Sequence, residues 1–401
     1  MFETLAAGAS PPKDAAPDDH CRRVGAISNL IAHQLFLPTE EKQLLHSACL
    51  LHHSASPVTA DVRGVLDAFL SPAAGTAAQC KLGAILRLCD AYDREYAAQS
   101  IEPGDSAQIL AGLRRGVAQG KWPREIVDAL QQCTRPCLMP ASSAWRIPVF
   151  PQAALETLRA MRDQMASIPR VVHAARRDPA TAGAILQLAN SALYGDRGQV
   201  STLQLAVARL GFETARKVVA SLAMRPVLFL PKMEDLWPHS IQVADLAEQL
   251  ASLTGGIDPG EAYLAGLLHD VGRIALGATT LYDAARLQGL EQSGCPAVYA
   301  ENLILQADHA SLGGQIAVVW RLPQHLVSAI RRHHRPESAS PADASRGSLA
   351  HLLYLAEYLT GCPEDLPSTA RLELSLTGLG LSARDLDRCS PSEVGSWLAA
   401  A

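Results

Sequence analysis

The chain has 401 residues, of which 48% are hydrophobic and only 5% aromatic, and its formal net charge is −5. This length allows two or three domains with sizeable cores. Ala and Leu recur while runs of β-branched residues are scarce, which predicts an all-α protein. The mild negative charge, without a dense Lys/Arg stripe, argues against binding of a nucleic-acid polymer.

The chain contains no uninterrupted apolar stretch of about 18 residues that could span a bilayer. Residues 1–19 have neither the basic start nor the apolar centre of a signal peptide. We therefore expect a cytoplasmic protein that does not bind a membrane, with a disordered segment at residues 1–19.

A first helical domain is predicted for residues 20–133. The segment HCRRVGAISNLIAHQLFLPTEEKQLLHSACLLHHSA, from His20, has the pattern of an amphipathic helix, a short polar turn and a second helix that contains Leu-Leu-His at His52. Further along, AILRLCDAYD predicts an apolar helix with Asp90 on one face. Residues 134–152 are rich in proline, which interrupts helices, so we predict a linker there.

Residues 153–361 are predicted to form a second helical domain, followed by a tail at 362–401. The segment HSIQVADLAEQLASLTGGIDPGEAYLAGLLHDVG, from His239, repeats the order of helix, polar turn and Leu-Leu-His. Its last histidine, His269, follows the first by 30 residues, against 32 in the first domain. HLLYLAEYLT then repeats the late apolar helix, with Glu357 as its acidic residue. Three matches in the same order indicate two related helical domains.

The clearest chemistry lies in LAGLLHDVGRIAL, at 264–276. Its leucines fall at helical spacing and predict a buried face, which places His269 and Asp270 at the end of a helix. We expect Gly272 to end that helix in a left-handed conformation. An imidazole beside a carboxylate suits a divalent Fe, Mn or Zn ion, but one residue of each type seldom suffices, so other segments must supply ligands.

Five other residues of the second half complete a candidate set. The predicted metal ligands are His239, His269, Asp270, His309, His333, His334 and Glu357. Inside a helical bundle they could hold one or two ions, and two ions about 3.5 to 4 Å apart would clamp both oxygens of a phosphoester. Each residue also has a structural alternative, as a hydrogen-bonded core histidine, a helix cap or a solvated acid. The cofactor is thus one or two divalent ions, or none.

Four ordered motifs of the second half resemble the HDOD domain, the HD-related output domain of bacterial signalling proteins. The resemblance covers residues 168–335, and the motifs are DPATAGAILQLANSALYG, STLQLAVARLGFETARKVVASLA, AYLAGLLHDVGRIAL and DHASLGGQIAVVWRLPQHLVSAIRRHHRP, the last of which ends at Pro336. The resemblance implies helical bundles of HD-superfamily type and a role in signal transduction. It marks Asn190 and Ser191 as family residues without giving them a reaction. A structural alternative is that Asn190 bonds to backbone near a helix end.

Parts of the ligand set also resemble hydrolytic relatives. His239 and the His269–Asp270 pair are similar to the signature of HD-superfamily phosphohydrolases. The later histidines His309, His333 and His334 resemble the extra ligands of the HD-GYP branch. The second half departs from that branch at Arg273, where its hydrolases carry Lys, and at Glu357, where they carry Asp. It also lacks a Gly-Tyr-Pro loop, so we do not expect hydrolysis of cyclic di-GMP.

The first half resembles a degenerate HD-GYP-type domain. His53 stands where that family has an aspartate, and residues 54–81 contain no histidine, so the middle ligands are missing. We expect no metal site there, and a scaffold or partner-binding role instead.

Two functions remain open at this point. The first is a bacterial signal-transduction regulator whose HDOD domain binds a signalling protein partner or a nucleotide, with a homodimer as one form. The second is a metal-dependent phosphohydrolase in which Asp270 and Arg273 are catalytic, Arg273 stabilising the developing negative charge. An intermediate form would bind metal for structure or sensing without hydrolysis.

Overall fold

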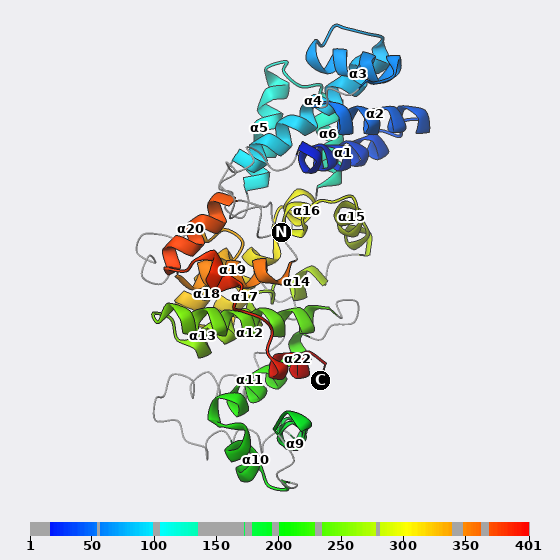
Figure 1. The fold of residues 1–401 in the computed structure, drawn as a ribbon. Helices are drawn as coiled ribbons and strands as arrows, with labels where there is room; N and C mark the ends of the chain where they lie inside the picture. The colour runs from blue at the N-terminus through cyan, green and yellow to red at the C-terminus, as the bar shows by residue number, and fades with distance from the viewer. Residues whose placement is uncertain are drawn as a thin grey trace. The chain divides into compact units, whose positions relative to one another are not determined.

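The computed structural model describes residues 17–53, 57–98, 105–134, 172, 179–194, 200–228, 235–277, 281–338, 348–361 and 369–400. Within these ranges the chain forms α-helices and short 3-10 helices and no strand, which confirms the predicted all-α class (Figure 1). None of the described helices is both long and apolar enough to cross a bilayer. Most of the predicted disordered segment and nearly all of the predicted linker lie outside the described residues.

The described helices fall into two compact units. The helices of the first unit are α1 (Pro17–Gln34), α2 (Thr39–Leu51), α3 (Ala60–Leu70), α4 (Ala77–Ala98), α5 (Asp105–Ala118), α6 (Arg124–Cys133), α15 (Leu281–Gln292) and α16 (Ala297–Leu305). Those of the second are α9 (Pro179–Ala189), α10 (Leu203–Leu210), α11 (Phe212–Leu228), α12 (Leu236–Thr254), α13 (Pro259–Leu268), α14 (Arg273–Gly277), α17 (His309–Val319), α18 (Gln324–Arg332), α19 (Ser348–Thr360), α20 (Thr369–Leu379), α21 (Ala383–Leu386) and α22 (Glu393–Ala400). Two short 3-10 helices, Ala192–Tyr194 and Pro336–Ser338, also belong to the second unit.

The first unit packs α1 against α2, α4 and α6. Helix α16 joins it although the sequence division places that segment in the second domain. The reason is aromatic packing: the Tyr299 ring lies 4.4 Å from Tyr96 and 6.4 Å from Tyr92, centroid to centroid, and all three rings are buried. Such pairs add stability beyond the apolar area they bury. Units defined by packing therefore differ from segments defined along the sequence.

In the second unit α12 lies at the centre and packs on α11, α13, α19 and α22. Gly255, in a left-handed conformation, ends α12. Asp258 then accepts a hydrogen bond from the backbone N–H of Glu261 and starts α13. The predicted leucine face of α13 is buried, and so is the rest of the helix from Gly260 to Leu268 apart from Glu261. A helix buried on nearly all sides holds its C-terminal end, and the His-Asp pair that follows, in one position.

Part of the predicted tail also packs on α12. The indole N–H of Trp237 donates to the carbonyl of Leu398 at 3.1 Å, and the hydroxyl of Ser392 donates to the buried carboxylate of Asp245 at 2.8 Å. Because these partners lie inside the second unit, the α22 segment contributes to its core.

The contact of α12 with α13 depends on Gly266. A Cβ at this position would lie 2.5 Å from Cα and 2.8 Å from the backbone nitrogen of Ala244, so the two helices could not keep their present separation. We predict that Gly266→Ala lowers the free energy of unfolding by about 1–3 kcal/mol, the usual range for overpacking. A Cβ at Gly183 on α9 would meet nothing within 4 Å, so Gly183→Ala is the matched control and should be neutral or stabilising by up to about 1 kcal/mol. Urea unfolding followed by circular dichroism measures both, and equal behaviour of the two variants would contradict the packing argument.

Candidate metal centre

All seven predicted ligands come together inside the second unit. They are supplied by α12 (His239), the end of α13 (His269, Asp270), the start of α17 (His309), the end of α18 (His333, His334) and α19 (Glu357). Their side chains are buried, apart from His239, which is 17% exposed. Their role as ligands remains a prediction, but their proximity is a property of the fold.

The seven side chains approach one another through atoms that can bind a metal. His239 Nε2 lies 3.2 Å from His269 Nε2, and His269 Nε2 lies 3.2 Å from Glu357 Oε1. On the other side of the cluster, His309 Nε2 lies 3.2 Å from Asp270 Oδ1 and 2.8 Å from Nε2 of His334. Nitrogen and oxygen atoms that bind the same metal ion lie at distances of this size from one another, because each bond to the ion is about 2.0–2.2 Å long.

Six of the seven residues fall into two overlapping groups that share His333, and His239 lies outside both. In each group the potential ligand atoms lie within 4.8 Å of one another. The groups are His309, His333 and His334, and His269, Asp270, His333 and Glu357. Because His333 Nδ1 donates to a backbone carbonyl, its Nε2 offers one lone pair, so His333 can bind an ion in either group but cannot bridge two ions.

Backbone carbonyls orient two of the imidazoles. His269 Nδ1 donates to the carbonyl of Gly266 at 2.6 Å, and His333 Nδ1 donates to the carbonyl of Ile330 at 2.7 Å. In the neutral form each ring then presents the lone pair of its Nε2 to the cluster. Hydrogen bonds of this kind fix the tautomer and orientation of histidines that bind metals.

Three buried atoms of the cluster make no hydrogen bond of good geometry: Asp270 Oδ1, Glu357 Oε1 and His333 Nε2. Asp270 Oδ1 and Glu357 Oε1 each lie 3.2 Å from an imidazole nitrogen, which pairs with the carboxylate only when that ring is protonated. An acceptor that is buried without a partner destabilises a fold by about 1–3 kcal/mol. All three are ligand-type atoms with available lone pairs, and a divalent cation among them would satisfy all three together. The residues present therefore fit a metal.

The electrostatics of the cluster separate its histidines. Burial lowers the pKa of His333 to about 4, with help from His269 and His309 and against the effect of Glu357. Burial and the neighbouring His333 likewise hold the pKa of His334 well below its usual value. These two rings are neutral at pH 7, which is the form that binds a metal.

The carboxylates act in the opposite direction on His269. Burial lowers its pKa, but the charges of Asp270 and Glu357 outweigh that effect and raise it to about 9. Burial alone would raise the pKa of both acids. For Asp270 the charges of Arg273 and the histidines outweigh burial and hold the pKa far below its ordinary value. For Glu357, His334 and His239 have the same effect. Both acids are therefore ionised at neutral pH.

The expectation for Gly272 is wrong. It is absent from the described glycines with positive φ, so it does not end α13 in a left-handed conformation. It is needed for a close approach instead, because a Cβ there would collide with the carbonyl oxygen of His309 and lie 2.5 Å from the backbone nitrogen of Gly313. The missing side chain lets the start of α17 reach the His-Asp pair.

Asn190 and Ser191 bond to backbone of their own neighbourhood. The amide of Asn190 donates to the carbonyl of Val200 and accepts from its N–H, both at 2.8 Å, while the Ser191 hydroxyl donates to the carbonyl of Leu188 at 2.7 Å. These contacts tie the segment after α9 to the segment before α10. They support the structural alternative for Asn190.

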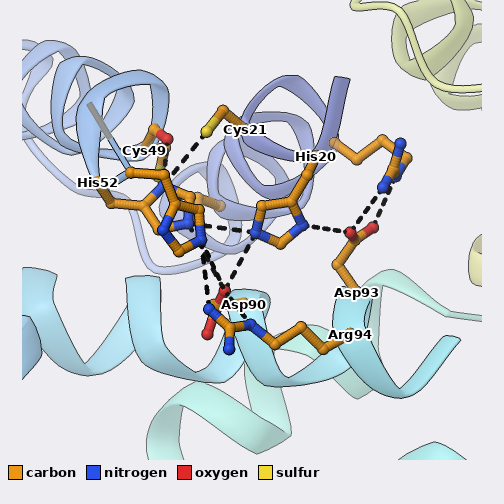
Figure 2. Close-up of polar contacts among 10 residues, drawn as sticks. His20, Cys21, Cys49, His52, Asp90, Asp93 and Arg94 are labelled. Atoms are coloured by element: carbon orange, nitrogen blue, oxygen red, sulfur yellow. Dashed lines mark hydrogen bonds and ion pairs between the residues drawn. The ribbon is translucent and has the colours of Figure 1, made fainter. Parts of the chain in front are cut away.

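A second histidine cluster, which sequence reasoning missed, lies in the first unit. The ligand-type atoms of His20, His52, His53 and Asp90 lie within 4.8 Å of one another. Figure 2 shows His20, His52 and Asp90 pointing toward one another. The separation of His20 Nε2 and His52 Nε2, 3.3 Å, nearly equals that of the corresponding pair in the second unit. A signal was present in the sequence, because His53 replaces the expected aspartate by a residue type that can also bind a metal.

Comparison with known proteins finds similar sequences and structures. Residues 147–336 match the HDOD domain family. An uncharacterized protein of Treponema pallidum (strain Nichols) is 27% identical over 247 residues, which cover 59% of this chain and 48% of that protein. This chain therefore spans about half the length of the curated relative that it matches.

Two solved structures are also similar. An HDOD domain protein of unknown function from Geobacter sulfurreducens has a TM-score of 0.50 at 24% identity, covering 63% of this chain and 87% of that one, which shows a shared fold. A candidate signal transduction protein from Marinobacter aquaeolei VT8 has a TM-score of 0.53 at 25% identity, covering 63% and 59%. Together with the family match and the ordered motifs of the second half, these similarities establish that the chain carries an HDOD domain.

Proposed function

We propose that this protein is a cytoplasmic signal-transduction regulator whose HDOD domain binds divalent metal ions at the seven-residue cluster. In this proposal the metal is a structural or sensory element, and the output is binding of a signalling protein partner or a nucleotide, with a homodimer as one form. The similarity to the Marinobacter protein supports the signalling role.

The main support for a bound metal is the set of three buried ligand-type atoms that make no hydrogen bond of good geometry, Asp270 Oδ1, Glu357 Oε1 and His333 Nε2. The two buried carboxylates attract positive charge, since they outweigh the effect of burial and raise the pKa of His269 to about 9, and a metal ion would take the place of that proton. A mixed nitrogen and oxygen set suits Fe, Mn or Zn.

The position of Arg273 favours regulation over catalysis. Its Nε donates to Asp270 Oδ2 at 2.7 Å, so its charge already balances one of the carboxylates of the cluster. A cation committed to a ligand in this way is poorly placed to stabilise charge that develops on a substrate.

A metal-dependent phosphohydrolase is the second candidate. It is favoured by the number of ligand-type side chains that meet in the cluster, since hydrolysis of phosphoesters often uses two ions and each ion needs several ligands. A bound divalent ion supplies Lewis-acid polarisation of a phosphoryl oxygen. In this candidate Asp270 would hold the metal and Arg273 would stabilise the negative charge that develops on the phosphoryl group.

The first prediction of this proposal concerns metal content. Asp270→Asn should lower the bound Fe, Mn or Zn by at least one ion per chain relative to wild type, because it removes a carboxylate from the centre of the cluster. Elemental analysis after purification without chelators, and again after addition of each metal, measures this. Added metal at about 100 times its dissociation constant should stabilise the wild type by about 2.7 kcal/mol, and less in the variant.

The matched control for metal content is Asp258→Asn. Asp258 is exposed at the start of α13, and Asn also caps helices well, so the charge change is the same and the helix is kept. This control should keep the wild-type metal content. A wild type that acquires no metal under any of these conditions would contradict the proposed metal site.

The second prediction concerns turnover. The metal-loaded protein should hydrolyse the chromogenic diester bis(4-nitrophenyl) phosphate no faster than Asp270→Asn does, because Arg273 is already paired. Release of nitrophenolate, followed over a range of metals, measures the rate. Clear turnover that is abolished by Asp270→Asn and retained by Asp258→Asn would establish the phosphohydrolase in place of the non-catalytic regulator.

A further inference from the structure

The cluster of the first unit has the dimensions of a four-coordinate metal site. Asp90 Oδ1 lies 3.1 Å from His20 Nε2, 3.6 Å from His52 Nε2 and 3.9 Å from His53 Nε2. The nitrogens of His20 and His52 are 3.3 Å apart. Ligands at about 2.1 Å from a tetrahedral ion are separated by about 3.4 Å, which falls within this range of distances.

Two hydrogen bonds point imidazole lone pairs into the cluster. His20 Nδ1 lies 2.6 Å from Asp93 Oδ2, and the carboxylate of Asp93 is held in turn by the guanidinium of Arg23 at 2.8 and 2.9 Å (Figure 2). His52 Nδ1 lies 2.6 Å from the carbonyl oxygen of Cys49. Both acceptors require a proton on Nδ1, so each Nε2 carries a lone pair in the neutral ring. A carboxylate or carbonyl behind a ligating histidine is the usual support of a metal site.

These lone pairs face each other across 3.3 Å and need a cation between them. Two rivals to a metal are a proton on His20 and the guanidinium of Arg94. Arg94 Nε donates to Asp90 Oδ1 at 2.9 Å, and its Nη2 lies 3.2 Å from His53 Nε2. The Arg94 side chain is 58% exposed, so it can leave the cluster without opening the core.

Of the four ligand-type side chains, three are largely buried and one is exposed, so the site is open to solvent on one side. Those of His52, Asp90 and His20 are 0%, 13% and 16% exposed, whereas that of His53 is 39% exposed. An ion can therefore enter beside His53, where Arg94 now lies. Three imidazoles and one carboxylate favour Zn²⁺, Co²⁺ or Ni²⁺ over the oxygen-seeking Mg²⁺ and Ca²⁺.

We propose that the first unit contains a second, independent metal site, in which His20, His52, His53 and Asp90 bind one ion such as Zn²⁺, Co²⁺ or Ni²⁺. The ion displaces Arg94 when it enters. The imidazole of His53 takes the ligand position that the sequence comparison assigned to a lost aspartate. The proposal does not depend on the metal centre of the HDOD domain, because all its ligands lie in the other unit.

The test uses the full chain with Asp270→Asn and Glu357→Gln, which disable the other cluster. Equilibrium dialysis against Zn²⁺ with elemental analysis should find one ion per chain. Adding His53→Ala should weaken binding by at least about tenfold, and adding Asp93→Asn should weaken it by about 10–100-fold through the support of His20. Arg94→Gln should tighten binding, because it removes the competing cation. Co²⁺ should give the visible absorption of a tetrahedral nitrogen and oxygen site.

His46→Gln is the matched control. His46 is an exposed histidine on α2 outside the cluster, and its replacement should leave Zn²⁺ binding unchanged. If the chain without the second cluster does not fold, as judged by circular dichroism, His53→Ala in the wild-type chain should remove one ion while the others remain.

Three results would overturn the proposal: no Zn²⁺ bound in either background, equal binding by His53→Ala and His46→Gln, or no gain of affinity in Arg94→Gln. The first would mean that a proton and Arg94 satisfy the cluster in place of a metal, the second that His53 is not a ligand, and the third that the ion does not displace Arg94. None of them bears on metal content at Asp270, which the single variants of the second unit measure separately.

Discussion

The close contact of α12 with α13 is the constraint on which the cluster of seven ligand-type residues depends. Gly266 lets the two helices approach until backbone meets backbone, and this brings His239 and His269 to 3.2 Å. The other ligands come from helices that must reach the same point, and Gly272 allows the start of α17 to do so. Small residues at two contacts thus set the position of seven ligand-type side chains.

The first unit uses the same device with a different outcome. In each unit a histidine near the start of one helix meets a histidine at the end of the next, and the second histidine bonds through Nδ1 to a carbonyl three residues earlier, at 2.6 Å. The second unit surrounds this pair with two carboxylates and three more histidines, whereas the first adds only His53 and Asp90. This difference in ligand number favours two ions in one unit and a single ion in the other.

An arginine lies beside a ligand carboxylate in both units. Arg273 pairs with Asp270 at 2.7 Å, three residues away on the chain, and Arg94 pairs with Asp90 at 2.9 Å, four residues away. Their exposures differ, with 20% for Arg273 and 58% for Arg94. The less exposed pair is a fixed counterion, whereas the more exposed arginine is able to exchange with another cation.

Local patterns in the sequence determined the helical class, the HDOD motifs and the order of the seven ligand-type residues, because helical periodicity and residue chemistry are local properties. Packing decided the rest. Tyr299 carries α16 into the first unit, and Leu398 joins the core of the second through Trp237. Gly272 contacts the start of α17, and His53 lies close to Asp90. Both contacts join segments that are far apart in sequence, and only the tertiary structure brings such segments together.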